Sequence, residues 1–466
     1  MNFLSNLAIP ESGERLTLLR YLLVVATIFF ATYASIVSVA STFSAVFDWG
    51  ARKSGIKHYH RFAADLADLA APNKGIIYSL AVVPLMAIIL IYAQLLYGMN
   101  LGITSYLVCS AVFFLLGFYV FYGYKRSLHL SPILTAFQRL AGSQGSEAQP
   151  DLIKDVESFD YSATKTLKRG GRRSAILFWT GTWFFVGATR LAFTPRQWSD
   201  SSLVTILFSN ETLCGLLGYV VTALIITSAA VLFFFFKWEG GIARFADDSY
   251  STFVKKRTLP VGLVAAVLEP MLILFEIRNL PQVGLSNLTF VVGCVGMFTA
   301  LLLVFLFYSM LRDSRINLGS YAFACVVVLV LVWTAKDEIA FHYATRNQTE
   351  VLGQRYESML ASLNPGTAQP IISGEEIYDG RCSACHRFDI KLVGPPYNQT
   401  LPHFVGKIDS LEDFIMDPRQ VVPGYPPMPK QGLKPAEVKA VAEYIMGIYL
   451  KSHPQATLAD TTKKKI

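Results

Sequence analysis

Charged residues are scarce in this chain of 466 amino acids: Asp, Glu, Lys and Arg together make up 16% of it, against 53% hydrophobic residues. Soluble domains carry about 25% charged residues. The deficit excludes an ordinary soluble fold for most of the chain and indicates an integral membrane protein. The net charge of +8 does not indicate a nucleic-acid partner, because the basic residues concentrate in loops that would face anionic lipid.

Histidine and cysteine are also rare, with seven and six residues. No histidine lies in the apolar segments, so a haem with histidine ligands inside the membrane is not expected. Four cysteines do lie there and are expected to be small packing residues: Cys109, Cys214, Cys294 and Cys325. The chemistry of the chain should therefore be sought outside the membrane.

Eight apolar segments are long enough to span a bilayer, at about 18–46, 75–98, 102–124, 174–195, 212–236, 259–280, 287–311 and 318–336. The loops on one side of these spans hold 21 Lys and Arg, whereas those on the other hold only Arg15 and Arg196. Since basic loops stay in the cytoplasm, both termini are predicted to face the periplasm of a bacterial inner membrane.

An ordered internal repeat relates the first four spans, about 18–196, to the last four, about 212–340. Phe47-Asp48-Trp49 matches Phe236-Lys237-Trp238, and Arg61 to Asp65 matches Arg244 to Asp248. Four spans per unit make the copies parallel, so the prediction is all-α: two parallel four-helix bundles within residues 1–340. Chance similarity between apolar helices is the alternative explanation.

The motif Cys382-Ser-Ala-Cys385-His386 is typical of covalent haem attachment, with His386 as an axial ligand of the iron. Met428, between two prolines, is the favoured second ligand, and Met416 is the rival, expected instead to pack on a helix. A zinc site would need a second Cys or His pair, and only His403 lies near. Haem chemistry is therefore the preferred interpretation.

The residues around this motif resemble a small class I cytochrome c over about 370–452. The resemblance rests on Gly374 and Tyr378 before the motif, Val393-Gly394-Pro395 after it, and a last helix that carries Tyr444. It implies that the last helix crosses the first, and that Tyr378, Pro395 and Tyr444 border the haem. Tyr378 and Tyr444 as plain core aromatics are an equal alternative.

The tandem bundles also resemble the subunits of cytochrome bd-type quinol oxidases, through the architecture and through Arg61-Phe62-Ala63 before the second span. The chain departs from that family in having no histidine within its spans. That departure argues against dioxygen reduction by this chain alone.

A few ionisable residues lie inside the predicted spans, where each is a candidate functional residue. Glu269 lies near the midplane, with Glu276, Arg278, Arg190 and Lys336 towards the outer face. These residues form a candidate quinone or proton site. In the structural alternative, which is favoured, Glu269 pairs with Arg278 or a backbone group and the outer residues reach water.

Residues 341–370 are predicted to form an external helix, 347–363, and a linker. The cytochrome domain is predicted over 371–452 and a disordered tail over 453–466. The favoured function is a monohaem c-type cytochrome subunit that relays single electrons within a respiratory or photosynthetic membrane complex. It would work with other membrane subunits and a soluble or membrane-bound redox partner, without a catalytic site of its own. The alternative is a quinol-oxidising subunit, with quinone near Glu269 and Glu276 as a further cofactor.

Overall fold

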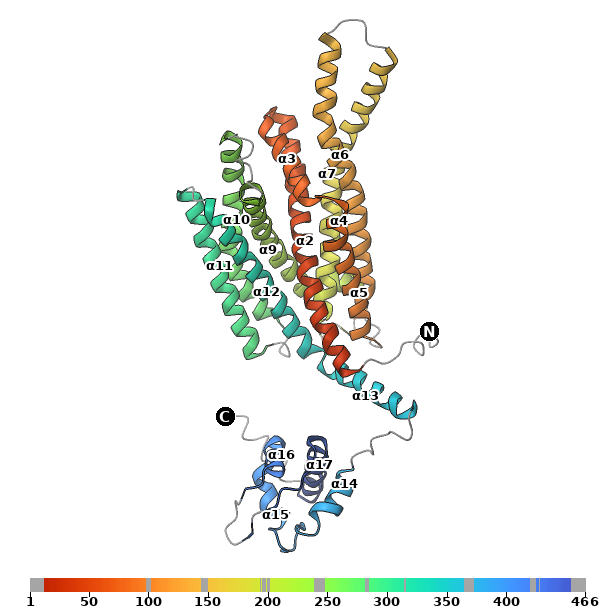
Figure 1. The fold of residues 1–466 in the computed structure, drawn as a ribbon, viewed down its shortest axis with the longest axis vertical. Helices are drawn as coiled ribbons and strands as arrows, with labels where there is room; N and C mark the ends of the chain where they lie inside the picture. The colour runs from red at the N-terminus through yellow and green to blue at the C-terminus, as the bar shows by residue number, and fades with distance from the viewer. Residues whose placement is uncertain are drawn as a thin grey trace. The chain divides into compact units, whose positions relative to one another are not determined.

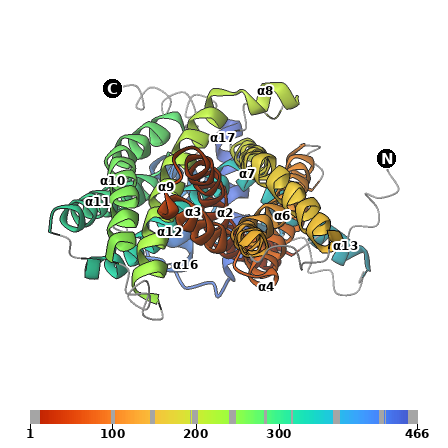
Figure 2. The same ribbon diagram turned by 90° about the horizontal axis from the view of Figure 1, so that it is seen from above.

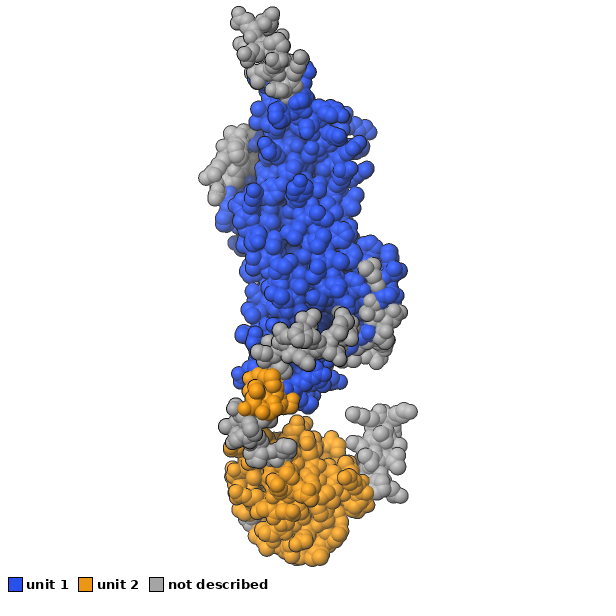
Figure 3. Space-filling model, turned by 90° about the vertical axis from the view of Figure 1, so that its right-hand side faces the viewer, with its two compact units in different colours: residues 1–355 blue, residues 356–466 orange. Residues whose placement is uncertain are grey.

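The computed structural model describes residues 12–97, 102–143, 150–192, 194, 198, 202–238, 248–280, 285–313, 316–363, 373–419, 425–426 and 428–453. All regular elements in these residues are helices, which confirms the predicted all-α class. The chain forms two compact units, residues 1–355 and 356–466 (Figure 3). The predicted tail from residue 454 onward and the linker residues 364–370 lie outside the described residues.

The first bundle begins with α2 (Gly13–Ser54), whose start is capped by Ser12 and whose end is closed by Gly55 in the left-handed conformation, φ 69°. Three further hydrophobic elements pack with it: α4 to α5 (Lys74–Leu95), α6 (Ile103–Ser143) and α7 (Pro150–Ala192). A π-helical turn at Tyr78–Val82 precedes Pro84 in the second of these.

The second bundle contains α9 (Asn210–Phe236), α10 (Asp248–Asn279), α11 (Asn287–Asp313) and α12 (Gly319–Ala344). The short α8 (Leu203–Leu207) precedes it, and Ser209 caps α9 by accepting a hydrogen bond from the Thr212 amide. Viewed along the helices, α2 lies between the two groups and packs against both α9 and α12 (Figure 2). The two bundles therefore share one interface centred on α2.

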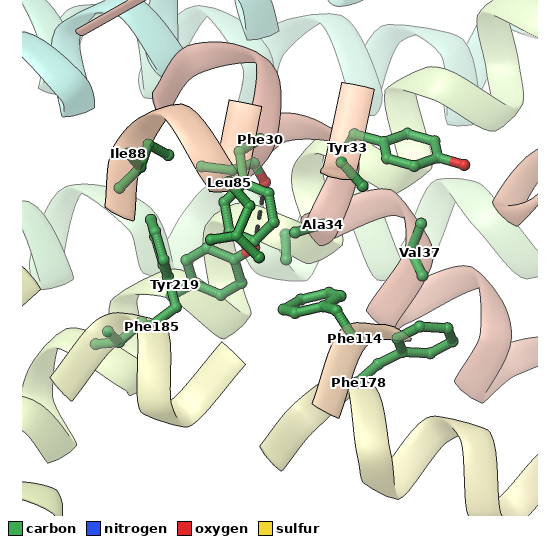
Figure 4. Packing of buried hydrophobic residues seen from close by; sticks show 14 of the residues in the cluster. Phe30, Tyr33, Ala34, Val37, Leu85, Ile88, Phe114, Phe178, Phe185 and Tyr219 are labelled. Atoms are coloured by element: carbon green, nitrogen blue, oxygen red, sulfur yellow. Dashed lines mark hydrogen bonds between the residues drawn. The ribbon is translucent and has the colours of Figure 1, made fainter. Parts of the chain in front are cut away.

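Aromatic side chains fill the core of the first bundle. Phe30 makes edge-on contacts with Phe114 and Phe185, at 5.3 and 4.8 Å between ring centroids (Figure 4). Tyr219 of α9 enters the same cluster, and its hydroxyl donates a hydrogen bond of 3.1 Å to the Ala31 carbonyl of α2. The Ala31 carbonyl also accepts from the Ser35 hydroxyl, at 2.7 Å. In an apolar medium a buried hydroxyl without a partner is costly, so the bond from Tyr219 helps to hold α9 against α2.

Seven helices are long and apolar enough to cross a membrane within the described residues, against eight predicted spans. The difference is the segment 174–195, which falls in α7. This segment is helical to Ala192, but its Thr, Gly and Trp residues make it less apolar than the others. Membrane spanning is thus supported for seven segments, and the eighth span, with the parallel repeat, stays a prediction.

The long basic segment 125–173, predicted as a loop, is mostly helix. α6 and α7 continue through most of it and project beyond the neighbouring helices as a hairpin (Figure 1). At 1.5 Å per residue a helix of 41 residues measures about 60 Å, roughly twice the hydrocarbon thickness. Hydropathy marks where a helix leaves lipid, but not where it ends.

The amphipathic helix α3 (Lys57–Ala70) follows α2 and lies at the end of the bundles opposite residue 344. There it contacts helices of both bundles. The Tyr250 hydroxyl of α10 donates a hydrogen bond to Asp65, and the Arg61 guanidinium lies 4.1 Å from the centre of the Tyr250 ring. The repeat motif that contains Arg61 and Asp65 therefore has a structural role. Residues 244–247 of its predicted counterpart lie outside the described residues.

The helix α13 (Arg346–Leu363) follows α12, close to the predicted external helix, and the boundary between the two units falls inside it. The C-terminal domain contains α14 (Gly374–Ile377), a π-helical turn Tyr378–Cys382, α15 (Tyr397–Thr400), a 3-10 turn Leu401–Phe404, α16 (Ile408–Met416) and α17 (Pro435–Ser452). Its core lies between α16 and α17 and includes Val441, Ile445 and Leu411.

Candidate functional site

The Cys-x-x-Cys-His motif forms a tight turn at the end of the π-helical segment. The carbonyl of Cys382 accepts hydrogen bonds from the amides of Cys385, at 3.1 Å, and His386, at 2.9 Å. Cys382 is buried, with 7% of its surface exposed, whereas Cys385 is half-buried. The backbone therefore holds both sulfurs and the imidazole within one turn.

His386 is oriented by a single backbone contact. Its Nδ1 lies 3.0 Å from the Pro395 carbonyl oxygen, and a carbonyl can only accept, so Nδ1 carries the proton. This leaves the lone pair of Nε2 free for a metal, the arrangement found for most ligating histidines. The Tyr397 ring stacks on the imidazole, with 5.1 Å between centroids and an angle of 19°.

Gly394 lets the loop pass directly against the imidazole. A Cβ at this position would lie 2.2 Å from Cε1 of His386, a distance that no side chain could occupy. The Gly394 amide in turn donates a hydrogen bond of 2.9 Å to the Cys385 carbonyl. The Val-Gly-Pro segment is thus part of the histidine's support.

A cavity of about 470 Å³ opens beside His386, within the 300–1,000 Å³ typical of sites for bulky organic ligands. Met428 lines it together with Cys382, His386 and Pro395, and apolar walls come from the 3-10 turn, α16 and α17 through Leu401, Phe404, Leu411, Phe414, Ile415 and Ile445. Met416 is not among the described lining residues, and 44% of its surface is exposed. Of the two candidate methionines, the cavity brings only Met428 into the same space as His386.

The inner wall of the cavity is uncharged. Burial raises the pKa of the Cys382 thiol, an effect partly offset by its hydrogen bond with Tyr397. Burial also raises the pKa of the Tyr397 hydroxyl, so both groups are neutral at neutral pH. Polar groups gather in other parts of the lining, at Gln399, His403, Arg419 and Gln431. An apolar, planar ligand with charged substituents fits this distribution.

Tyr378 and Tyr444 lie at a helix crossing rather than in the described lining of the cavity. Their rings are 5.8 Å apart, and Gly374 brings α14 so close to α17 that an added Cβ would lie 2.1 Å from the Ala440 carbonyl oxygen. The crossing that the cytochrome resemblance implies is therefore present. The structure places the two tyrosines as core aromatics, and of the three predicted pocket residues only Pro395 lines the cavity.

Two weak contacts flank Met428. The Lys430 ammonium lies 2.7 Å from Asp417 at the end of α16, and the Lys391 ammonium lies 4.7 Å from the centre of the Tyr425 ring. Gly432, in the left-handed conformation with φ 64°, turns the chain towards α17. The methionine segment is thus attached on both sides to the body of the domain.

A helical domain of this size, with a Cys-x-x-Cys-His turn, a histidine oriented for metal binding and a methionine in the same apolar cavity, defines a small c-type cytochrome. The family model described as cytochrome c matches residues 371–448. Cytochrome c-551 of Azotobacter vinelandii is 33% identical over 78 residues, which are 16% of this chain and 95% of that protein. Cytochrome c-552 of Hydrogenobacter thermophilus is 36% identical over 70 residues, 14% of this chain and 71% of that protein.

Through this domain the chain belongs to the cytochrome c family, and haem c is its cofactor. It is a c-type cytochrome joined to a domain of helices suited to crossing a membrane. The relatives match less than a fifth of the chain, so they describe the haem domain and not the bundles.

The second candidate site, in the bundles, is a buried ionic network. Glu276 accepts from Arg190, at 3.4 Å, and from Lys336, and Asp337 lies 3.9 Å from Arg190 and 3.6 Å from Lys336. Arg190, Glu276 and Lys336 are each no more than 5% exposed. The expectation that these residues reach water is wrong: they are paired with one another at the ends of α7, α10 and α12.

Glu269 has a different partner from the one expected. Its Oε1 accepts a hydrogen bond of 2.8 Å from the Thr222 hydroxyl of α9. Arg278, the partner expected from the sequence, is instead an exposed residue on the surface of α10. Oε2 of Glu269 has no hydrogen-bond partner among the described residues. Arg278 is therefore separate from the site that sequence analysis assigned to it.

Several residues of both sites escaped sequence analysis. Nothing in the sequence distinguishes Tyr397 and Phe414 from other aromatic residues. Both line the cavity, because the fold of the domain brings their segments to it. Arg190 packs against Gly215 of α9, where an added Cβ would lie 2.4 Å from its Nε. Glu276 packs against Gly218, where an added Cβ would lie 2.0 Å from its Oε1. The feature of the sequence that could have indicated this packing is the pair of glycines three residues apart in a predicted span, because small residues let neighbouring side chains and helices approach closely in a membrane.

Proposed function

We propose that the chain is a membrane-anchored monohaem c-type cytochrome subunit that relays single electrons within a respiratory or photosynthetic membrane complex. The observation that carries this proposal is the common cavity of Cys382, His386 and Met428. Cys382 and Cys385 would hold the haem covalently, and His386 Nε2 and the Met428 sulfur would fill both axial positions. Bound haem supplies a one-electron carrier, and a Met/His pair leaves no open position for substrate.

The protein's own residues set the conditions for that role. The Pro395 carbonyl fixes the imidazole, and the apolar walls exclude water. Ile390, Leu392 and Val393 are large apolar side chains exposed next to the loop that supports His386. Such a patch suits brief docking of a redox partner, since exposed apolar groups beside a haem edge allow contact without strong charge attraction. We also propose that the haem domain lies on the periplasmic side of a bacterial inner membrane, where it meets its redox partner and the other subunits of the complex.

The quinol alternative finds little room beside Glu276, the residue proposed for it; a larger cavity of the bundles, about 240 Å³, lies elsewhere, between Phe43, Thr227 and Thr258. The cavity beside Arg190 and Glu276 measures about 10 Å³, close to the space for one water molecule and far below that of a quinone ring. Quinol also delivers two electrons, while one c-type haem accepts one. These observations favour the relay.

Rapid mixing of the oxidised, full-length chain with a quinol and with a one-electron donor separates the two functions. A relay is reduced by the one-electron donor alone. Saturable quinol-dependent reduction of the haem in the isolated chain, lost in Glu269→Gln, would instead establish the quinol-oxidising subunit. Glu157→Gln, an exposed carboxyl on α7, is the matched control.

A further inference from the structure

Two buried carboxyl groups of α10 face the same side of α9. Oε1 of Glu276 lies against Gly218, and Oε1 of Glu269 accepts from Thr222, four residues further along α9. Four residues correspond to a rise of about 6 Å. The two carboxyls are thus about one helical turn apart, close enough to interact electrostatically with each other and with Lys336.

The charges at this place balance without Glu269. Arg190 and Lys336 supply two cations, and Glu276 and Asp337 supply two anions. Glu269 is 3% exposed and has no ion pair within the part of the chain that the structure describes. An ionised carboxylate buried without a cation is very costly, so such a group takes up a proton.

Two small cavities, each with a few polar groups in a largely apolar lining, adjoin the network at the exit end, defined as the end where α7, α10 and α12 finish. One, of about 10 Å³, is bordered by Arg190, Glu276 and Asn279, and another, of about 30 Å³, by Trp333, Asp337 and Glu338. These volumes hold about one and two waters. Trp333 Nε1 and Asp337 Oδ1 border the second cavity and are buried without a hydrogen-bond partner among the described residues, as expected of groups that bind water.

From Glu269 away from the exit end, the next buried positions of α10 are Ala266, Ala265, Gly262 and Leu259, followed by the polar Thr258. The other charged or titratable groups near the exit end are Glu211 and Cys214 of α9, Glu338 and His342 of α12, and Arg20 of α2, whose guanidinium contacts His342. These protonatable groups gather towards the exit end, whereas a separate cavity of about 240 Å³ towards the other end is lined by Thr227, Ser228, Arg257 and Thr258.

We propose that Glu269 is a proton-loading site, which exchanges its proton with water at the exit end through Glu276, Asp337 and the waters of the two cavities. In the exchange the proton leaves a carboxyl oxygen of Glu269, reaches Glu276 Oε1 through one bridging water, because the two carboxyls make no direct hydrogen bond, and passes on to water at the exit end; an equivalent proton returns by the same route. No electron is moved. The site ends near the middle of α10, about 15 Å from its last residue at 1.5 Å per residue.

Infrared spectroscopy of the full-length, haem-loaded protein tests this assignment. A protonated carboxyl gives a C=O stretching band that shifts when water is replaced by D₂O. We expect this band in the native chain, its loss in Glu269→Gln and its retention in Glu157→Gln. We expect Glu276→Gln to slow the shift about 10²-fold, the low end of the effect of a positioned proton-transfer group.

Thr222→Val provides a second test that does not remove the carboxyl. It abolishes the hydrogen bond to Oε1 and should raise the frequency of the C=O band without abolishing it. Either of two results would overturn the proposal: a band unaffected by Glu269→Gln and by Thr222→Val, or a shift in D₂O whose rate is the same with and without Glu276. Electron relay by the haem does not depend on either outcome.

Discussion

The hydrogen bond from His386 Nδ1 to the Pro395 carbonyl determines which ring nitrogen is available to iron. At this scale the account depends on a few atoms: one carbonyl, one glycine that admits the imidazole, and one methionine sulfur. Met428 and Met416 are only 12 positions apart, yet one lines the cavity and the other is exposed. The ligand set can therefore be tested by single substitutions.

Met428→Ala is expected to remove the weak sulfur-to-iron absorption at the red end of the visible spectrum and to lower the haem potential, because a Met/His pair raises that potential. Covalent haem should remain. Visible spectroscopy and redox titration provide the measurement, with Met416→Ala as the matched control. Loss of the band in Met416→Ala alone would show that the assignment is wrong.

Gly374→Ala is expected to destabilise the cytochrome domain by about 1–3 kcal/mol, the usual cost of overpacking, because the new methyl group meets the Ala440 carbonyl. Denaturant unfolding followed by the haem spectrum measures it. Gly447→Ala on α17 is the control: nothing lies within 4 Å of its Cβ position, so the change should stabilise the helix by about 0.5–1 kcal/mol. Equal effects of both substitutions would contradict the close helix crossing.

Among the elements, the segment between α16 and α17 holds Met428, the proposed second iron ligand, and is attached to α16 by a surface ion pair. The Lys430 ammonium next to Asp417 lowers the pKa of that carboxyl. The pair therefore contributes stability above the unfolded pKa of an aspartate, and the contribution is lost as pH falls through the lower, folded pKa. Both side chains are largely exposed, so the effect is small and sensitive to salt.

Asp417→Asn is expected to weaken retention of the methionine ligand slightly at neutral pH. The difference from the native chain should vanish as the pH is lowered through the folded pKa of Asp417. The sulfur-to-iron band, followed against denaturant at several pH values, reports this directly. A difference that grows on acidification would contradict the direction of the shift.

The elements also show which features sequence could predict. The tight turn that brings Cys382, Cys385 and His386 together depends on local spacing, and the apolar runs mark most membrane helices. The pairing of Glu276 with Arg190 and Lys336 was not predictable, because it joins three helices through two glycines of α9 that have no charge pattern of their own. The helical hairpin of α6 and α7 was not predicted either, because Pro132 and the Gly170-Gly171 pair indicate breaks although both helices continue through them.

At the scale of the whole molecule, a haem domain of about a hundred residues follows a membrane domain more than three times as long. At this scale the domain boundaries, the side of the membrane and the partner subunits stay predictions. The basic hairpin of α6 and α7 and the cytochrome domain are predicted on opposite sides, which makes the orientation accessible to labelling.

A membrane-impermeant maleimide applied to intact spheroplasts should label Ser452→Cys, in the cytochrome domain, and not Ser162→Cys, on the hairpin. Both positions are exposed helical serines, so they react equally once the membrane is opened with detergent. Labelling of Ser162→Cys in intact spheroplasts would reverse the predicted topology.

The central claim is that this membrane-anchored c-type cytochrome carries one covalently held haem and no haem within its bundles. Reduced-minus-oxidised spectra of the purified full-length chain, combined with quantification of its pyridine haemochrome, test that claim most directly. The account predicts one haem c per chain and no b-type signal. A b-type signal from the purified chain, or haem that is extracted by acid acetone, would contradict it.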